Sequence, residues 1–419
     1  MAKTLDVYLH NELVGHLIQD DGGQTVFDYA PSWLDKPGAT RLSQSLPLRE
    51  KRFSRNECRG FFAGILPDES KRDLVARNLG ISARNDYAML EQIGGECAGA
   101  ITFVPSGHAL PQRDYQYRPL SSRELAGILR ELPRRPLLAG EDGIRLSLAG
   151  AQDKIAVRIV GDEVSVPLGV APSTHILKPA VERFAGVVFN EALCMKLAAA
   201  SGLSAAAVET RNVHGVEYLS VERYDRIRRP ADGGQFELDR LHQEDFCQAQ
   251  GIVPETKYQK EGGPSLRQCF ALVREVSSAP VLDLPRLLDA VIYNLLVGNN
   301  DAHGKNFSLL YHGAGTAEQT IRLAPLYDIV STIYYPELSK TMAMRIGREY
   351  SSDSVAPDGF EQLAEEAGLA KPMVRNRVAE LADTVIESLK FVDTSNPVSE
   401  AVAALIRKRS ENIRRMFKT

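Results

Sequence analysis

Apolar and polar residues alternate along the start of the chain, which is typical of strands with one buried face. From Leu5 to Tyr29 the alternation is broken at the polar stretches HNEL and QDDGGQ, which predicts short antiparallel strands joined by turns. Helical spacing follows in DESKRDLVARNLG, which closes on a glycine, and again over Asp86 to Ile93. ITFVP is predicted to be a strand. A loop is predicted to follow at Pro105, Gly107, Pro111 and Gln112.

A second region of strands begins after a polar, proline-containing boundary near residues 132 to 143. The pattern predicts strand, turn and strand over IRLSLAGAQDKIAVRIV, and further strands at VSVPLG, at THILKPA and as a pair over VETRNVHGVEYLSVERYD. One helix, Val187 to Ala200, interrupts these strands and ends before Gly202. The pattern therefore predicts a small sheet with one helix packed against it.

From Glu244 onward the spacing of apolar residues becomes that of amphipathic helices. The clearest predicted helices are Leu284 to Val297, Phe360 to Ala367, Met373 to Leu389 and Val398 to Phe417. The chain is therefore predicted to belong to the α+β class, with a β-rich part followed by an all-helical part. The pattern gives three domains, at residues 1–137, 138–242 and 243–419.

Composition and charge narrow the class of protein without identifying it. The 419 residues suffice for two or three packed units, and 50 basic against 54 acidic side chains give a formal charge of -4, which offers no overall attraction to nucleic acid. MAKTLDVYLH lacks the apolar core of a signal peptide, and no apolar run is long enough to span a bilayer. We therefore expect a cytoplasmic protein without a membrane partner. Five widely spaced cysteines without paired-ligand motifs predict buried free thiols.

One candidate for catalysis is Asp301, which stands five residues before Asn306 in NNDAHGKNFSLL. This is the D-x-x-x-x-N spacing of a kinase catalytic loop, in which the carboxylate orients the substrate hydroxyl and accepts its proton while the amide binds magnesium. Asp328 follows two strand-like runs, SLLYH and IRLAPLYDIVS, so a short hairpin could bring it beside Asn306 as a second metal ligand. The alternatives are an Asx turn at Asp301 and a helix N-cap at Asp328.

Candidate phosphate-binding residues lie earlier in the chain. No Walker A motif occurs, but small residues between Ser147 and Lys154 could let backbone N–H groups approach phosphate oxygens. A tight turn without a ligand explains the same residues. Lys178 follows the strand THILK, where a kinase lysine grips phosphates, and Glu191 on the next helix could pair with it, although both side chains could simply be solvated. Along the chain, the small-residue loop is followed by a lysine, a glutamate, a connector, an aspartate, an asparagine and a second aspartate. This order favours a kinase.

Several motifs resemble those of the HipA family of kinase toxins. They are FFAGILPDE, RLSLAGAQDK, STHILKP, VERYDR, QEDFCQAQG, KYQKEGGP, GNNDAHGKNFSLL and LYDIVST. The resemblance spans nearly the full chain in the family's order. It implies a bilobal, protein-kinase-like α+β fold, in which residues 1–137 form an extra N-terminal subdomain, 138–242 the core of the N-lobe and 243–419 a helical C-lobe.

The same resemblance implies a set of functional residues for a serine/threonine protein kinase that uses ATP and Mg²⁺. Asp301 would be catalytic, Asn306 and Asp328 would bind the metal, and Glu191 would pair with Lys178. Ser147 would be autophosphorylated, which would displace the phosphate-binding loop and switch the kinase off. The implied ATP contacts are Ala149, Gly150, Ala151, Gln152, Asp153, Lys154, Lys178, Glu222, Arg223, Tyr224, His303, Gly304, Lys305, Asn306, Tyr327, Asp328, Ile329 and Val330.

The resemblance also implies partners and leaves alternatives. The family's toxins pair with a HipB-like helix-turn-helix antitoxin that binds operator DNA, and glutamyl-tRNA synthetase is the implied protein substrate. Asn299 and Asn300 stand where ordinary kinases have the His and Arg of H-R-D, so control through an activation-loop phosphate is not expected. A small-molecule kinase of the aminoglycoside type and a non-catalytic co-repressor remain alternatives.

Basic residues near the end of the chain could contact DNA. They are Arg407, Lys408, Arg409, Arg414 and Arg415. A solvated helix face explains them equally.

Overall fold

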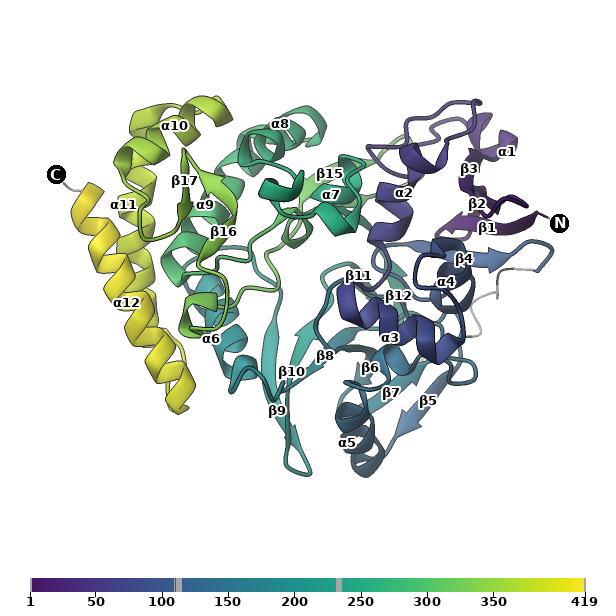
Figure 1. Ribbon diagram of the computed structural model, residues 1–419, viewed down its shortest axis with the longest axis horizontal. Coiled ribbons are helices and arrows are strands. Elements are labelled where there is room, and N and C mark those ends of the chain that lie inside the picture. Colours follow the sequence, from purple (N-terminus) through teal and green to yellow (C-terminus); the bar gives the residue numbers. More distant parts are fainter. Residues whose placement is uncertain (1, 109, 111–114, 231–235, 418–419) are drawn as a thin grey trace. The chain divides into compact units, whose positions relative to one another are not determined.

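The computed structural model describes residues 2–108, 110, 115–230 and 236–417 (Figure 1). Pro111 and Gln112 of the predicted loop lie outside these described residues. The chain divides into two compact units. The first unit comprises residues 1–179, 211–255 and 309–320, and the second comprises 180–210, 256–308 and 321–419. Strands dominate the first and helices the second, so the predicted α+β class is confirmed.

The first unit opens with an antiparallel sheet of strand order β3-β2-β1-β4. Its strands are β1 (Lys3–Leu9), β2 (Glu12–Gln19), β3 (Thr25–Tyr29) and β4 (Ile101–Pro105). Leu5, Val7 and Leu9 alternate on the buried face of β1, as the sequence pattern predicts. Helices of this region are α1 (Pro31–Leu34), α2 (Arg55–Gly64), α3 (Glu69–Leu79) and α4 (Asp86–Ile93). The predicted antiparallel strands and both predicted helices are therefore confirmed.

A second sheet has the strand order β5-β7-β6-β8-β10-β9. Its strands are β5 (Tyr117–Leu120), β6 (Ile155–Val160), β7 (Glu163–Pro167), β8 (His175–Pro179), β9 (Val208–Val213) and β10 (Val216–Glu222). The first unit also contains α5 (Ser122–Glu131), β11 (Arg226–Pro230), β12 (Phe236–Arg240), β13 (His242–Asp245), α7 (Phe246–Ala249) and β14 (Ser308–His312). The first three residues of β9 and Ser308 of β14 are assigned to the second unit.

The sequence prediction of a strand over IRLSLAG is wrong. Residues 144–150 form only isolated bridges, between Leu146 and Glu96 and between Gly150 and Pro67. The run is apolar because it is buried, but its backbone hydrogen bonds go to two loops. Ser147 N donates to Glu96 O, and Asp68 N donates to Gly150 O. The segment is therefore held as an irregular loop rather than as a member of a sheet.

The second unit is built mainly from helices, and α11 and α12 run side by side in Figure 1. The helices are α6 (Val187–Ala200), α8 (Leu266–Val276), α9 (Pro280–Val297), α10 (Pro357–Ala367), α11 (Lys371–Ser388) and α12 (Pro397–Phe417). The predicted helices are confirmed, with bounds that differ by a few residues at their ends.

The description of residues 243–419 as all-helical is wrong. This region also contains β14, β15 (Thr320–Leu323), β16 (Thr341–Ile346) and β17 (Glu349–Ser351). β16 pairs with β17, and its Met and Ile side chains are buried. The predicted strand IRLAPLYDIVS stops at Leu323 because Pro325 lacks the N–H group that pairing requires.

The five cysteines, Cys58, Cys97, Cys194, Cys247 and Cys269, are free and buried, as predicted. In the described parts of the chain, no helix combines the length and apolar character needed to cross a bilayer.

Candidate functional site

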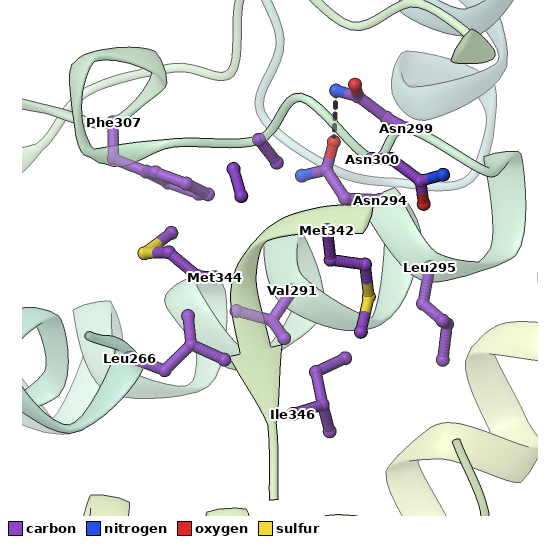
Figure 2. Close-up of a pocket in the computed structure, with 12 residues that line it drawn as sticks. Leu266, Val291, Asn294, Leu295, Asn299, Asn300, Phe307, Met342, Met344 and Ile346 are labelled. Carbon is purple, nitrogen blue, oxygen red and sulfur yellow. Dashed lines mark hydrogen bonds between the residues drawn. The ribbon is translucent and has the colours of Figure 1, made fainter. Parts of the chain in front are cut away.

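The loop that carries Asp301 begins where α9 ends. Gly298 has a left-handed φ of 71°, and Asn299 N donates to Asn294 O at 2.8 Å, which closes the helix and redirects the chain. The Asn299 amide donates to the Asn294 side chain at 2.8 Å (Figure 2), and its oxygen accepts the Asp301 N–H at 3.1 Å. Asp301 is exposed. The backbone of this aspartate is therefore fixed from α9 while its side chain faces solvent.

The segment around Asp328 lies against this loop within the second unit. Ala324 N donates to Ser308 O at 2.9 Å, the Tyr327 hydroxyl donates to Lys305 O at 2.7 Å, and Asn306 Nδ2 approaches Asp328 O at 3.4 Å. The structure therefore brings Asn306 and Asp328 together, as the predicted hairpin requires.

The backbone of Asp328 has an unusual conformation. Its φ is 58°, in the left-handed region that residues other than glycine rarely occupy. Such strain is found where the surrounding structure fixes the residue for a function. The neighbouring Ile329 is buried and Val330 is half-buried, so the segment beyond Asp328 packs into the unit. The N-cap alternative for Asp328 does not hold, because the following short helix, Thr332–Tyr334, has Ser331 at its N-cap.

The imidazole of His303 lies buried among charged groups. Burial is the largest effect on its pKa, Lys257 and Lys305 lower it further, and Asp328 opposes them. The resulting pKa is about 3. His303 is therefore neutral at physiological pH, and the positive charges that act on it are those of Lys257 and Lys305. Gly304, Lys305 and Asn306 are buried as well, in a single turn of 3-10 helix.

The donor set at the loop suits magnesium. Asn306 and Asp328 provide an amide oxygen and a carboxylate, and Mg²⁺ prefers such hard oxygen ligands while keeping waters and substrate phosphates in its shell. The Asn306 Nδ2 group faces Asp328 O, which leaves its oxygen for a cation. Among the residues that the structure describes, no group of three or more His, Cys, Asp or Glu side chains is arranged as a metal site. A centre held wholly by such side chains therefore receives no support, whereas a two-ligand magnesium site fits.

The small-residue loop of the first unit is held by its own polar contacts. Gly150 has a φ of 102°, and a Cβ there would lie 2.7 Å from Lys154 Nζ. Lys154 Nζ donates to Ala149 O at 2.7 Å, and Lys71 pairs with Asp153 at 2.5 Å. The positive φ therefore favours glycine at the turn. Ala149, Ala151 and Gln152 are half-buried beside it.

Ser147 is buried in the structure, with no exposed surface. Its hydroxyl donates to Ile65 O at 3.0 Å and its N–H donates to Glu96 O at 2.9 Å. In this conformation the hydroxyl is not accessible to a phosphoryl donor. Modification of Ser147 would require the loop to leave its position.

Lys178 is buried at the end of β8, where it pairs in register with Leu219 of β10. It belongs to the first unit, whereas Glu191 is buried on α6 in the second, and their predicted pairing stays a prediction. In the predicted connector, Glu222 is exposed, and its Oε1 atom lies 3.6 Å from Arg228 Nη2. The Tyr224 hydroxyl donates to the Gln243 side chain.

Arg223 lies in a buried ion cluster of the first unit. Its guanidinium contacts Glu96 at 3.1 Å and Asp225 at 2.7 Å, and Arg226 and Arg240 contact the same glutamate. Burial acts to raise the pKa of Glu96, but the three guanidinium groups outweigh it and lower the pKa to about 2. The Arg223 side chain is therefore engaged in ion pairs in the core. A contact of this residue with ATP would have to come from its backbone.

Two neighbouring residues that the sequence reasoning did not assign lie at the loop that carries Asp301. Tyr258 donates its hydroxyl to Asp301 Oδ1 at 2.9 Å, and its ring packs edge-on against His303 at 5.4 Å. The nearby Lys257 is buried. Both belong to the motif KYQKEGGP, but no local pattern links them to a residue more than forty positions away.

Comparisons with known proteins agree over nearly the whole chain. Residues 146–389 match the model of the HipA-like C-terminal domain, and residues 5–104 match that of the HipA N-terminal domain. The protein Y4mE of Sinorhizobium fredii is 48% identical over 94% of this chain and 93% of its own. The serine/threonine-protein kinase toxin HipA of Shewanella oneidensis is 29% identical over 93% of this chain and 89% of its own.

A solved structure has the same fold. It is that of the Shewanella oneidensis toxin-antitoxin system, a complex of HipA, HipB and operator DNA, and a chain in it matches with a TM-score of 0.83 and 27% identity. The match covers 99% of this chain and 100% of that one.

Proposed function

The chain belongs to the HipA family, and we propose that it is a serine/threonine protein kinase that transfers the γ-phosphoryl group of ATP to a protein. The observation that supports this most is the contact of Asn306 with Asp328, whose backbone is strained, at the loop that also carries Asp301. Spacing alone leaves an Asx turn as an alternative for Asp301. An exposed carboxylate beside two oxygen ligands for magnesium is the arrangement that phosphoryl transfer requires.

Each residue of this loop has a separate role in the proposal. Asp301 orients the acceptor hydroxyl and accepts its proton, while Asn306 and Asp328 hold magnesium. The bound metal would neutralise charge on the ATP phosphates. His303, being neutral, contributes hydrogen bonding rather than charge, and Lys305 supplies a cation. We assign Gly304, Tyr327, Ile329 and Val330 to the nucleotide site on the family resemblance.

Residues of the first unit are proposed to bind the rest of the nucleotide. The turn from Ala149 to Lys154 would offer backbone N–H groups to phosphates, since Gly150 lets the chain turn without a side chain. Lys178 would contact the phosphates and pair with Glu191, and the connector from Glu222 to Tyr224 would contact the base. The burial of the Arg223 side chain restricts that residue to its backbone groups.

We also propose that Ser147 is autophosphorylated and that this modification inactivates the enzyme. Phosphate would add about two negative charges to a hydroxyl that now donates to Ile65 O, and no phosphate fits at that buried position. The modified loop would leave its place and lose the turn that binds ATP phosphates.

A HipB-like helix-turn-helix antitoxin is the proposed partner. The Shewanella oneidensis relative is part of a complex with HipB and operator DNA, and a net charge of -4 fits DNA contact through a partner. Arg409 is bound to Asp353 and Leu295 O, and Arg414 to Asp383, so these two basic residues of α12 are already engaged. We propose glutamyl-tRNA synthetase as the substrate and the cytoplasm as the location.

The test is phosphosite mapping after incubation of the purified protein with labelled ATP and magnesium. The wild type and Asp393→Ala, a control at an exposed aspartate of the second unit, should label Ser147 and a protein substrate. Asp301→Ala should label neither, with its fold intact by circular dichroism. Absence of magnesium-dependent ATP binding in the wild type would contradict the proposal and favour a co-repressor. Transfer to an aminoglycoside alone would favour a small-molecule kinase.

A further inference from the structure

Asp301 is held at two points that come from different segments of the second unit. Its N–H donates to Asn299, whose side chain is itself bonded to Asn294 on α9 (Figure 2). Its Oδ1 atom accepts the hydroxyl of Tyr258 at 2.9 Å. We propose that Tyr258 is a positioning residue for phosphoryl transfer, which fixes the orientation of the Asp301 carboxylate. This inference rests on the proposed kinase activity and adds a residue to its site.

The backbone around Tyr258 is shaped to hold this side chain. Glu261 N and Gly263 N both donate to Tyr258 O at 2.9 Å, which makes a compact turn. A Cβ at Gly263 would lie 2.5 Å from the carbonyl carbon of Lys257, so only glycine permits the turn to close. Gln259 accepts the Arg345 N–H at 2.9 Å, which ties the segment to β16. The turn is therefore anchored directly after the tyrosine.

The ring of Tyr258 is also confined. It meets the His303 ring edge-on, with centroids 5.4 Å apart and an interplanar angle of 76°, and Lys257 Nζ lies 5.4 Å from its centre. Edge-on aromatic pairs and cations over a ring face are both attractive. With the ring held by these neighbours, the hydroxyl has a defined direction toward Asp301.

Fixing one oxygen of the carboxylate matters because Asp301 is exposed. An exposed aspartate can rotate about its side-chain bonds, and each misdirected rotamer is unproductive. A hydrogen bond to an ionised carboxylate is stronger than one between neutral groups. By engaging Oδ1, Tyr258 fixes the orientation of the carboxylate that would receive the proton of an acceptor hydroxyl. Asn299 and Asn294 hold the backbone in a loop that lacks the His and Arg of H-R-D, and Tyr258 directs the side chain.

The experiment compares Tyr258→Phe with Tyr350→Phe, a tyrosine control on β17 in the same unit whose ring packs against Lys260. Steady-state kinetics with a protein substrate would be measured beside calorimetric binding of magnesium and a non-hydrolysable ATP analogue. We expect kcat of Tyr258→Phe to fall by about tenfold to a hundredfold, as for loss of a hydrogen bond to a charged group. Nucleotide affinity and the thermal unfolding midpoint should stay at the wild-type values, and Tyr350→Phe should match the wild type throughout.

An unchanged kcat in Tyr258→Phe, with an active wild type, would overturn the inference while leaving the proposed function in place. Equal losses of kcat and nucleotide affinity would also overturn it, because they would show a general disturbance of the loop. Phosphate mapped on Tyr258 itself would identify the tyrosine as an acceptor rather than a positioning group. An inactive wild type would instead contradict the kinase proposal.

Discussion

The segment 147–154 of the first unit and the segment 299–306 of the second both contain groups proposed for phosphoryl transfer or its control. The two segments direct these groups in opposite ways. The first turns them inward: Ser147 is buried against Ile65 O, and Asp153 is paired with Lys71. The second fixes its backbone inward through Asn299 but leaves Asp301 exposed. An exposed carboxylate can act without rearrangement, whereas a buried hydroxyl cannot. Under the proposed function, Asp301 can therefore act as it stands, whereas the 147–154 segment must rearrange before Ser147 can be modified.

The largest effect should come from Asp328. Replacing it with alanine removes one of the two proposed protein ligands to magnesium, so we expect activity to fall by about 10⁴-fold, equal to about 5 kcal/mol. Magnesium-dependent ATP binding should weaken with it, whereas Asp301→Ala should lose activity at almost unchanged ATP affinity. Calorimetry of both variants checks this division. The reverse pattern would mean that the two aspartates exchange roles.

The buried ion cluster of the first unit should be sensitive to loss of one member. Arg223→Ala leaves Glu96 and Asp225 short of a guanidinium in the core, which costs about 3–5 kcal/mol when a buried pair is broken. Arg229, exposed on β11 and paired with Asp239, is the matched control, and its alanine variant should lose no more than about 1 kcal/mol. Urea unfolding measures both. A small loss of stability in Arg223→Ala would show that the core does not depend on this side chain. The side chain could then make the ATP contact that the resemblance implies.

Glu244 is as buried as Glu96 but has neutral partners. Burial raises its pKa to about 7, although hydrogen bonds from Ser43, Tyr311 and Gln44 N act in the opposite direction. Between pH 4.5 and 7 the unfolded chain releases this proton before the folded one does, so stability falls as pH rises. The loss should approach roughly 3 kcal/mol in the wild type. Glu244→Gln should remove it, as measured by urea unfolding at pH 5 and pH 8. An unchanged pH dependence would contradict this account.

Local sequence patterns predicted the regular elements better than the polar loops. The bounds of α4, α6 and β4 match the predicted ranges because each has clear periodicity and a clear end. The pattern missed α5, although Ser121 and Glu124 form a readable capping box at its start.

The candidate site was predictable only in part. The approach of Asn306 and Asp328 follows from a short hairpin, which spacing can indicate. The contacts of Ser147 with Ile65, of Arg223 with Glu96 and of Tyr258 with Asp301 join residues far apart in sequence. No local pattern contains such pairs, because they depend on how whole elements pack.

The smallest effect should come from Lys71. Its ion pair with Asp153 is mostly buried, and we expect its loss to weaken the inward position of the 147–154 segment by about 1 kcal/mol. A change of that size populates the open loop about fivefold more, so Ser147 in Lys71→Ala should be phosphorylated about fivefold faster. Phosphorylation of Ser147 would be followed by mass spectrometry, with Lys51→Ala as a control at an exposed lysine. The initial rate on a separate protein substrate should not rise, because Asp301 is exposed whether or not the loop opens. A parallel rise of both rates would show that the two segments are not controlled separately.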